Sequence, residues 1–434
     1  MSVDRIVIIG SGQAGFEAAV SLRSHGFSGS ITLVGDEPGV PYQRPPLSKA
    51  YLHCDPDRDS LALRPAQYFE DHRITLACGK PVVRVDRDAQ LVELIDATVI
   101  EYDHLILATG ARNRLLPVPG ADLPGVHYLR TAGEAESLTS SMASCSSLVV
   151  IGAGFIGLEV AAAARKKGLD VTVVEAMDRP MARALSPVMS DYFSAAHTEH
   201  GVHMRLSTGA KTVVEADARA AGVTTTSGDV IPADAVVVGI GVVPNIELAV
   251  LAGLPVNNGI VVDEYLRTPD ENISAIGDCA AYPIPGTARL VRLESVQNAV
   301  DQARCLAAQL TGTSINYRSV PWFWSEQYES KLQMAGLTAG ADTQVVRGSV
   351  DSGAFSIFCF LGTRLLGVES VNKPRDHMAA RKILASGMPL TPEQAADTDF
   401  DLKLAIARHK DTHKDTHKDE VASAEVGERQ VVAS

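Results

Sequence analysis

Two glycine-rich turns of the form G-x-G-x-x-G carry the clearest chemistry in this sequence. They contain Gly10, Gly12 and Gly15 in the first turn and Gly152, Gly154 and Gly157 in the second. In such a turn the first glycine permits a tight bend and the second lets backbone N–H groups approach a pyrophosphate. The third glycine lets the following helix pack closely on the strand. Each turn therefore predicts a binding site for a dinucleotide.

An acidic residue follows each turn at the distance that such a site requires. Asp36 lies 21 residues after the last glycine of the first turn, and Glu175 lies 18 residues after that of the second. A carboxylate at this place bonds the ribose hydroxyls of an adenosine. Glu175 would also repel the 2′-phosphate of NADPH, and Ala176 and Met177 bring no cation to offset that repulsion. We therefore expect one bound flavin, FAD, and one exchanging nicotinamide, NADH.

The segments around the two turns predict the elements that would hold them. Short, β-branched apolar runs at 5–9 and 31–34 are typical of buried parallel strands on either side of a helix. The same pattern returns as a strand at 148–152, a helix at 155–168 and a strand at 171–175. Further apolar runs within 104–112, 235–245 and 273–281 also end in glycine turns. Alternation of this kind indicates α/β domains with parallel sheets.

The pattern changes after about residue 320. Two apolar runs within 356–371 flank a Gly-Thr-Arg turn, which favours antiparallel strands, and 376–386 has the pattern of an amphipathic helix. We expect a separate α+β domain over 321–405. Residues 406–434 contain a His-Lys-Asp-Thr repeat with alternating charge, which predicts a disordered tail. Three histidines of this repeat would bind a metal only if the tail were helical.

Composition excludes several classes of function. The net charge of -13 disfavours non-specific binding to nucleic acid. No apolar run reaches the ~18 residues of a membrane span, and the beginning of the chain does not resemble a signal peptide. The six cysteines lie at least 24 residues apart, so they have no metal-ligand spacing. We expect a cytoplasmic protein that binds no nucleic acid, no membrane and no metal.

Five short segments resemble the FAD-dependent ferredoxin reductases of bacterial oxygenase systems. They are "GDEP...PYQRPPLSKAYL" at 35–52, "LATGAR" at 107–112, "IGAGFIGLEVA" at 151–161, "IGDCA" at 276–280 and "VPWFWSEQY" at 320–328. The segment RPPLSK within the first, followed downstream by PWFWS, is much more specific than the glycine turns. The likeness covers roughly residues 4–405. It implies an α/β, glutathione-reductase-like fold with two Rossmann-type dinucleotide-binding domains followed by the C-terminal α+β domain.

The resemblance also implies how the domains divide the chain. An FAD-binding domain would be split between 1–115 and 246–320, around an NAD-binding domain at 116–245.

The same resemblance implies which residues meet the cofactors. Lys49 would lie near the flavin, where a cation stabilises negative charge on the reduced ring. Glu159 would approach the nicotinamide and Trp322 would lie beside the isoalloxazine, so these three residues are expected at the reacting centre. Residues and resemblance together predict the cofactor contacts Gly10, Gly12, Ala14, Gly15, Asp36, Arg44, Lys49, Val82, Ala108, Thr109, Gly110, Arg130, Gly152, Gly154, Ile156, Gly157, Glu159, Glu175, Arg183, Gly241, Asp278, Val296 and Trp322.

The implied activity is transfer of hydride from NADH to FAD and of single electrons onward to an iron–sulfur ferredoxin of the two-iron type. That ferredoxin would serve a haem monooxygenase or a Rieske dioxygenase, an alternative that stays open here. An acidic ferredoxin needs a local basic patch, for which Arg304, Lys373 and Arg375 are the candidates.

Two rival functions fit the sequence less well. A disulfide reductase needs a redox cysteine near the flavin, but 41–45 reads Pro-Tyr-Gln-Arg-Pro and Cys54 comes later. A binding protein similar to apoptosis-inducing factor would use cofactor reduction to switch association. This sequence shows neither a mitochondrial presequence nor a long insertion in its C-terminal domain.

Overall fold

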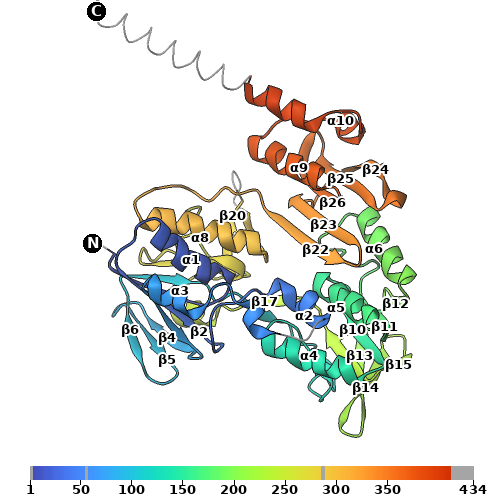
Figure 1. Ribbon diagram of the computed structural model, residues 1–434, viewed down its shortest axis with the longest axis horizontal. Coiled ribbons are helices and arrows are strands. Elements are labelled where there is room, and N and C mark those ends of the chain that lie inside the picture. The colour runs from blue at the N-terminus through green and yellow to red at the C-terminus, as the bar shows by residue number, and fades with distance from the viewer. Residues whose placement is uncertain (1–2, 54–56, 285–288, 412–434) are drawn as a thin grey trace, which may run out of the picture. The chain divides into compact units, whose positions relative to one another are not determined.

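The computed structural model describes residues 3–53, 57–284 and 289–411 (Figure 1). They form two compact units. The first contains the described residues within 1–182 and 190–319, and the second contains 183–189 and the described residues from 320 onward.

The first unit has two halves, each built on its own parallel sheet. The first half contains the five-stranded sheet in the order β19-β7-β1-β2-β3. Its strands are β1 (Arg5–Ile9), β2 (Ser30–Gly35), β3 (Ile74–Cys78), β7 (His104–Leu107) and β19 (Ile273–Ala275). Helix α1 (Gln13–Ser24) joins β1 to β2 and lies beside α8 (Val296–Leu310), as Figure 1 shows. The central strands are almost wholly buried, as their unbroken apolar runs require.

A second parallel five-stranded sheet repeats this plan in the order β12-β11-β10-β16-β9. Its strands are β9 (Val126–His127), β10 (Ser147–Ile151), β11 (Asp170–Val174), β12 (Val202–Arg205) and β16 (Ala235–Val238). Helix α5 (Phe155–Lys166) joins β10 to β11, as α1 joins β1 to β2. The predicted pair of strand–helix–strand units is confirmed.

Short antiparallel strands, which the sequence patterns did not predict, complete the first unit. The predicted strand over 104–112 divides into β7 and β8 (Ala111–Asn113), and that over 235–245 divides into β16 and β17 (Val242–Pro244). Strands β8 and β17 pair with each other. The chain leaves the first half after β8 and returns to it after β17. The predicted domain limits at 115 and 245 fall just after these strands. The assignment of one cofactor to each half remains a prediction.

The remaining elements of the first unit are small. The other strands are β4 (Val82–Asp86), β5 (Leu91–Leu94), β6 (Val99–Glu101), β13 (Ala210–Ala216), β14 (Arg219–Thr225), β15 (Val230–Pro232), β18 (Ile260–Val261), β20 (Ala280–Pro283) and β21 (Leu290–Val291). They pair antiparallel, except that β18 runs parallel to β20. The other helices are η1 (Pro45–Ser48), α2 (Ala50–His53), η2 (Arg58–Leu61), α3 (Ala66–Asp71), α4 (Ala132–Ser144), α7 (Glu247–Leu251) and η3 (Gly277–Cys279). Helix α6 (Pro187–Glu199) begins in the second unit and continues into the first.

The second unit is an antiparallel five-stranded sheet with helices, in the order β22-β23-β26-β25-β24. Its elements are β22 (Trp322–Gln327), β23 (Ser330–Gly336), β24 (Thr343–Ser349), η4 (Val350–Ser352), β25 (Ala354–Leu361), β26 (Arg364–Val371), α9 (Pro374–Ser386) and α10 (Pro392–Ala396). Strands β25 and β26 pair antiparallel around the predicted turn. The expected α+β character of this part is confirmed, and with it the predicted fold class.

The expected start of a disordered tail at residue 406 needs correction. The chain is helical over 402–411. Leu402 and Ile406, one helical turn apart, are buried in the apolar core of the second unit, which explains why the helix continues past 405. Most of the predicted tail, including the second and third histidines of the repeat, lies outside the described residues.

None of the helices in the described part of the chain combines the length and the apolar character that a membrane span needs.

Candidate functional site

The first glycine turn is tightly packed at two of its glycines and open at the third. Gly10 has φ +112°, and a Cβ added there would lie 2.1 Å from the carbonyl oxygen of Ala108 at the end of β7. A Cβ on Gly15 would lie 1.9 Å from the carbonyl oxygen of Gly10. A Cβ on Gly12 would meet no atom within 4 Å. The open position is the one expected to face a pyrophosphate.

The second turn repeats this arrangement. A Cβ on Gly152 would lie 2.5 Å from the carbonyl oxygen of Gly239, and one on Gly157 would lie 2.1 Å from the carbonyl oxygen of Gly152. A Cβ on Gly154 would have its nearest neighbour 3.8 Å away. The two turns thus share a geometry as well as a sequence pattern.

The helices that follow these turns have N-termini suited to an anion. The N-cap residues of α1 and α5 are Gly12 and Gly154, and neither supplies a side-chain cap. Neither helix has an acidic residue in its first turn. Backbone N–H groups and the positive end of each helix dipole therefore point toward the open side of each turn. These residues fit the pyrophosphates of two dinucleotides.

The two predicted ribose-binding acids differ in how they are held. Asp36 lies exposed directly after β2. The half-buried Glu175 follows β11, and its Oε2 accepts a hydrogen bond from the Ala153 N–H at 2.6 Å. Its Oε1 accepts another from the Met177 N–H at 2.8 Å. The Glu175 carboxylate is therefore fixed against the second glycine turn.

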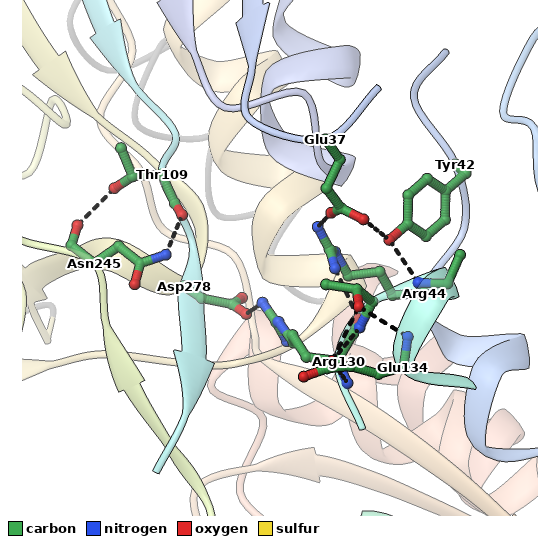
Figure 2. A network of polar contacts seen from close by, with 10 residues as sticks. Glu37, Tyr42, Arg44, Thr109, Arg130, Glu134, Asn245 and Asp278 are labelled. Carbon is green, nitrogen blue, oxygen red and sulfur yellow. Dashed lines mark hydrogen bonds and ion pairs between the residues drawn. The ribbon is translucent and has the colours of Figure 1, made fainter. Parts of the chain in front are cut away.

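Arg44 lies at the centre of a polar network that Figure 2 shows. Its Nη2 donates to Glu37 Oε1 at 2.6 Å, and its Nη1 donates to the carbonyl oxygen of Arg130 at 2.7 Å. The guanidinium carbon also lies 5.2 Å from the ring centroid of Tyr42. Tyr42 donates to Glu37 Oε2 at 2.6 Å and accepts a bond from the Ala132 N–H at 3.1 Å. Arg44 is thus held in one orientation by contacts on several sides.

Burial raises the pKa of the Tyr42 hydroxyl to about 12, with Arg44 opposing the shift and Glu37 adding to it. The hydroxyl is consequently neutral at physiological pH and remains a donor to Glu37. The Ala132 N–H that it caps is the first of helix α4. This contact ties the loop that carries Arg44 to the N-terminus of α4.

Arg130 and Asp278 form the second part of the network (Figure 2). Arg130 Nη2 lies 2.9 Å from Asp278 Oδ2. The Arg130 N–H donates to Glu134 Oε2 at 2.8 Å, and Glu134 also completes a capping box with Thr131 at the start of α4. Arg292, whose side chain is buried, donates to the carbonyl oxygen of Asp278 at 3.1 Å. The structure brings together the predicted contacts Arg44, Arg130 and Asp278.

Lys49 and Glu159 meet directly. Lys49 Nζ is 2.8 Å from Glu159 Oε2, and Ser48 Oγ donates a close hydrogen bond to the same oxygen. Lys49 follows η1 in the first half of the unit, whereas Glu159 lies on α5 of the second half. Side-chain exposure is 19% for Lys49 and 4% for Glu159. The pair therefore connects the two halves of the first unit, with the Glu159 carboxylate buried and Lys49 mostly covered.

The other predicted contacts of the first unit lie at the ends of its elements. Asn245 Nδ2 donates to the Thr109 carbonyl oxygen at 2.9 Å, and the Thr109 hydroxyl donates to the Asn245 carbonyl oxygen at 2.7 Å (Figure 2). The remaining contacts are Ala14 and Ile156 on α1 and α5, Val82 at the start of β4, Ala108 and Gly110 after β7, Gly241 after β16 and Val296 at the start of α8.

Two predicted site residues belong to the second unit. Trp322 begins β22, and the guanidinium of Arg381 lies 4.8 Å from its ring centroid. Arg183 is exposed in the segment before α6. Their places beside the cofactors remain predictions.

The three docking candidates do not fall in one unit. The side chain of Arg304 is 61% exposed and pairs with Glu17 at 2.7 Å in the first unit. Lys373 and Arg375 lie at the start of α9 in the second. Whether they form one basic patch remains a prediction.

The cysteines of the described residues are not paired with one another. Cys78, Cys145, Cys279, Cys305 and Cys359 are all free thiols. Burial raises the pKa of the Cys279 thiol, which disfavours the reactive thiolate. Cys54 lies outside the described residues.

Several residues of the network were missed from the sequence. Glu37, Tyr42 and Ser48 all lie in the stretch 35–52 that carries part of the resemblance, and their spacing around Arg44 and Lys49 was the available signal. Glu134 follows Thr131 as the fourth residue of a capping box, which is also readable from sequence. Asn245 had no such signal, because its partner Thr109 is far away in the chain.

Comparisons with known proteins agree with this geometry. Residues 4–303 match the family model described as pyridine nucleotide-disulphide oxidoreductase. The chain belongs to this family. Residues 322–406 match a second model, described as reductase C-terminal, which corresponds to the second unit.

Individual members of the family are similar over nearly the whole chain. Rhodocoxin reductase of Rhodococcus erythropolis is 92% identical over 429 residues, which cover 99% of this chain and 100% of that protein. The ferredoxin reductase for the CYP199A2 system from Rhodopseudomonas palustris is 51% identical with a TM-score of 0.91, covering 93% of this chain and 100% of that one. The covalent putidaredoxin reductase–putidaredoxin complex contains a chain 41% identical with a TM-score of 0.91, covering 94% and 100%.

Proposed function

We propose that this protein is an NADH-dependent FAD flavoprotein that reduces an iron–sulfur ferredoxin of a bacterial oxygenase system. The observation that carries the proposal is the pair of equivalent glycine turns, bridged by Lys49 and Glu159. Two dinucleotide sites joined at one buried ion pair suit the meeting of a flavin with a nicotinamide. The similarity to ferredoxin reductases over nearly the whole chain supports the choice of electron acceptor.

The residues of the first glycine turn would hold FAD. The open side of Gly12 would receive the pyrophosphate, Asp36 the adenosine ribose and Asp278 the ribityl region. Arg44 and Arg130 are already fixed by their partners, so little side-chain ordering is required on binding. Bound FAD supplies acceptance of a hydride and release of single electrons.

The residues of the second turn would hold NADH. Gly154 would face its pyrophosphate, and Glu175 would accept hydrogen bonds from its ribose hydroxyls. The fixed carboxylate disfavours the doubly charged 2′-phosphate of NADPH at the same place. Lys49 would hold a positive charge near the flavin, and Glu159 would neutralise that charge across the junction of the two halves.

A disulfide reductase is the second function open to this family. It requires a thiolate near the flavin, and the buried Cys279 with its raised pKa is unsuited to that role. We therefore place the exit of electrons at a docked ferredoxin. Because its reductant NADH is regenerated by cytoplasmic metabolism, we also propose that the protein acts in the cytoplasm.

The test is a comparison of electron acceptors with the purified protein. We expect it to contain FAD and to oxidise NADH much faster than NADPH. Cytochrome c should be reduced only when a two-iron ferredoxin is added as mediator. Efficient reduction of a small disulfide, with no stimulation by ferredoxin, would contradict the proposal.

A further inference from the structure

We propose that Ser48 is a positioning residue for the Lys49–Glu159 ion pair, which it holds in place at the junction of the two dinucleotide-binding halves. The inference rests on the proposed function, because it takes Lys49 and Glu159 to lie at the reacting centre. Ser48 lies in the segment that carries the resemblance, but it is not among the site residues predicted from the sequence.

The backbone around Ser48 is fixed before its side chain is considered. Pro45 and Pro46 begin η1, and the ring of each restricts φ. The Lys49 N–H donates to the carbonyl oxygen of Pro46 at 3.0 Å. Leu47 is only 2% exposed and anchors the turn in the core. Ser48 is 6% exposed and therefore has a defined place.

Two adjacent residues direct their donors to one acceptor atom. Ser48 Oγ and Lys49 Nζ both contact Oε2 of Glu159. Glu159 lies two residues after Gly157, on the helix that starts at the second glycine turn. The shared oxygen consequently links η1, which begins after Arg44, to the turn predicted to bind NADH.

The two donors differ in the freedom of their side chains. The ammonium of Lys49 ends a flexible four-carbon chain and can turn toward another partner. The Oγ of Ser48 is bonded directly to a Cβ that the backbone fixes, so it has only the three χ1 rotamer positions and far less reach than the lysine. Taking a carboxylate out of water is costly unless hydrogen bonds replace the lost hydration. Ser48 thus maintains a donor on Oε2 while Lys49 changes partner, and the carboxylate stays in place for the lysine to return.

The alternative is that Ser48 only fills space in a buried turn. Three variants separate the two roles. Ser48→Ala removes the hydroxyl, and Ser48→Thr keeps a hydroxyl at the same atom. Ser274→Ala is the matched control, because Ser274 is also buried and its hydroxyl contacts His104 Nε2 at 3.0 Å.

The first readout is flavin reduction by NADH in an anaerobic stopped-flow instrument. For Ser48→Ala we expect the limiting rate constant to fall about tenfold or more, the size expected for one lost hydrogen bond to a charged group. The NADH concentration for half-maximal rate should change less than about twofold, because NADH contacts are untouched. Ser48→Thr should recover most of the rate, and Ser274→Ala should match wild type.

The second readout needs no bound flavin. In the FAD-free protein, Ser48→Ala should lower the urea midpoint more in the wild-type background than in a Glu159→Gln background, because the hydroxyl acts through the carboxylate. Equal losses in both backgrounds, together with a slow Ser48→Thr variant, would mean a purely space-filling role and would overturn the inference.

Failure of the inference is distinguishable from failure of the proposed function. A Ser48→Ala protein that is reduced as fast as wild type overturns the role of Ser48 and leaves the function intact. A wild-type protein whose flavin is not reduced by NADH would contradict the proposed function itself.

Discussion

The backbone N–H of Ala153 donates a hydrogen bond of 2.6 Å to Oε2 of Glu175. This contact joins the strand end that carries the acid to the glycine turn at the start of the neighbouring helix. A second N–H, from Met177, binds the other oxygen at 2.8 Å. The carboxylate is therefore an organised acceptor whose position and charge both bear on the choice of nicotinamide.

Replacing Glu175 should specifically weaken the binding of NADH. Glu175→Ala removes an acceptor for the ribose hydroxyls, so we expect KM for NADH to rise about tenfold or more. Adding Ala176→Arg should then increase the use of NADPH, since a cation replaces the repulsive charge. Steady-state kinetics with both nucleotides provide the measurement. Asp170→Ala, at the exposed opposite end of β11, is the control, and a wild type that already prefers NADPH would refute the charge argument.

Substitution of the open glycine in each turn should affect the binding of one cofactor and not the other. Gly12 and Gly154 have ordinary negative φ, and an added Cβ meets no close neighbour at either. Gly12→Ala should therefore lose FAD but fold with a melting temperature near that of FAD-free wild type. Gly154→Ala should keep FAD and bind NADH weakly. Absorbance spectra and NADH titrations decide the matter, and loss of FAD in both variants would contradict the assignment of one cofactor to each turn.

Substitution of a tightly packed glycine should instead impair folding. Gly10 has φ +112°, and a Cβ there would lie 2.1 Å from a backbone oxygen that cannot move away cheaply. Gly10→Ala should thus yield little folded protein even when FAD is supplied. Equal stability of Gly10→Ala and Gly12→Ala, compared by thermal unfolding of the FAD-free proteins, would argue against the described packing of the turn.

Removing the hydroxyl of Tyr42 should weaken the binding of FAD without affecting the binding of NADH. Tyr42→Phe leaves the ring against Arg44 but breaks the bonds to Glu37 and to the Ala132 N–H. We expect FAD to dissociate about five- to tenfold more readily, because Arg44 loses part of its fixed surroundings. Fluorescence of released FAD upon dilution measures this. The control is Tyr128→Phe, since Tyr128 also accepts a backbone N–H bond but lies outside the network. Equal effects of both variants would show a general loss of stability.

Reversing the charge of Arg304 should separate the two halves of the reaction. Its side chain is 61% exposed, so Arg304→Glu changes the surface more than the core. Turnover with an acidic ferredoxin should fall and become less dependent on salt, while ferricyanide reduction stays near the wild-type rate. Lys211→Glu, an exposed charge reversal on β13, is the control. Unchanged ferredoxin turnover in Arg304→Glu would place the docking surface elsewhere.

The sequence predicted those parts of the fold that depend on neighbouring residues. The runs 6–9 and 148–151 are apolar throughout, and each leads into a glycine turn that only a limited set of conformations satisfies. The pairing of β8 with β17 was not predictable from such patterns. Each strand has only three residues, and the partners are far apart in the chain.

The candidate site also contains some residues that local sequence predicts and others that depend on distant parts of the chain. Glu175 and Lys49 were predicted, one by its distance from a glycine turn and the other by resemblance. The contacts of Glu37, Ser48 and Asn245 depend on how loops from distant segments meet, which local patterns do not encode. The helix over 402–411 was missed because its buried Leu402 and Ile406 lie beside a strongly charged repeat.

The most direct test of the central claim is a sequential anaerobic stopped-flow experiment on the wild-type protein. NADH is mixed first, in an amount equal to the bound FAD, and an excess of oxidised two-iron ferredoxin is mixed second. We predict that the flavin absorbance is lost in the first step and recovered in the second, with two ferredoxins reduced for each NADH consumed. A flavin that NADH reduces but that ferredoxin fails to reoxidise would contradict the account.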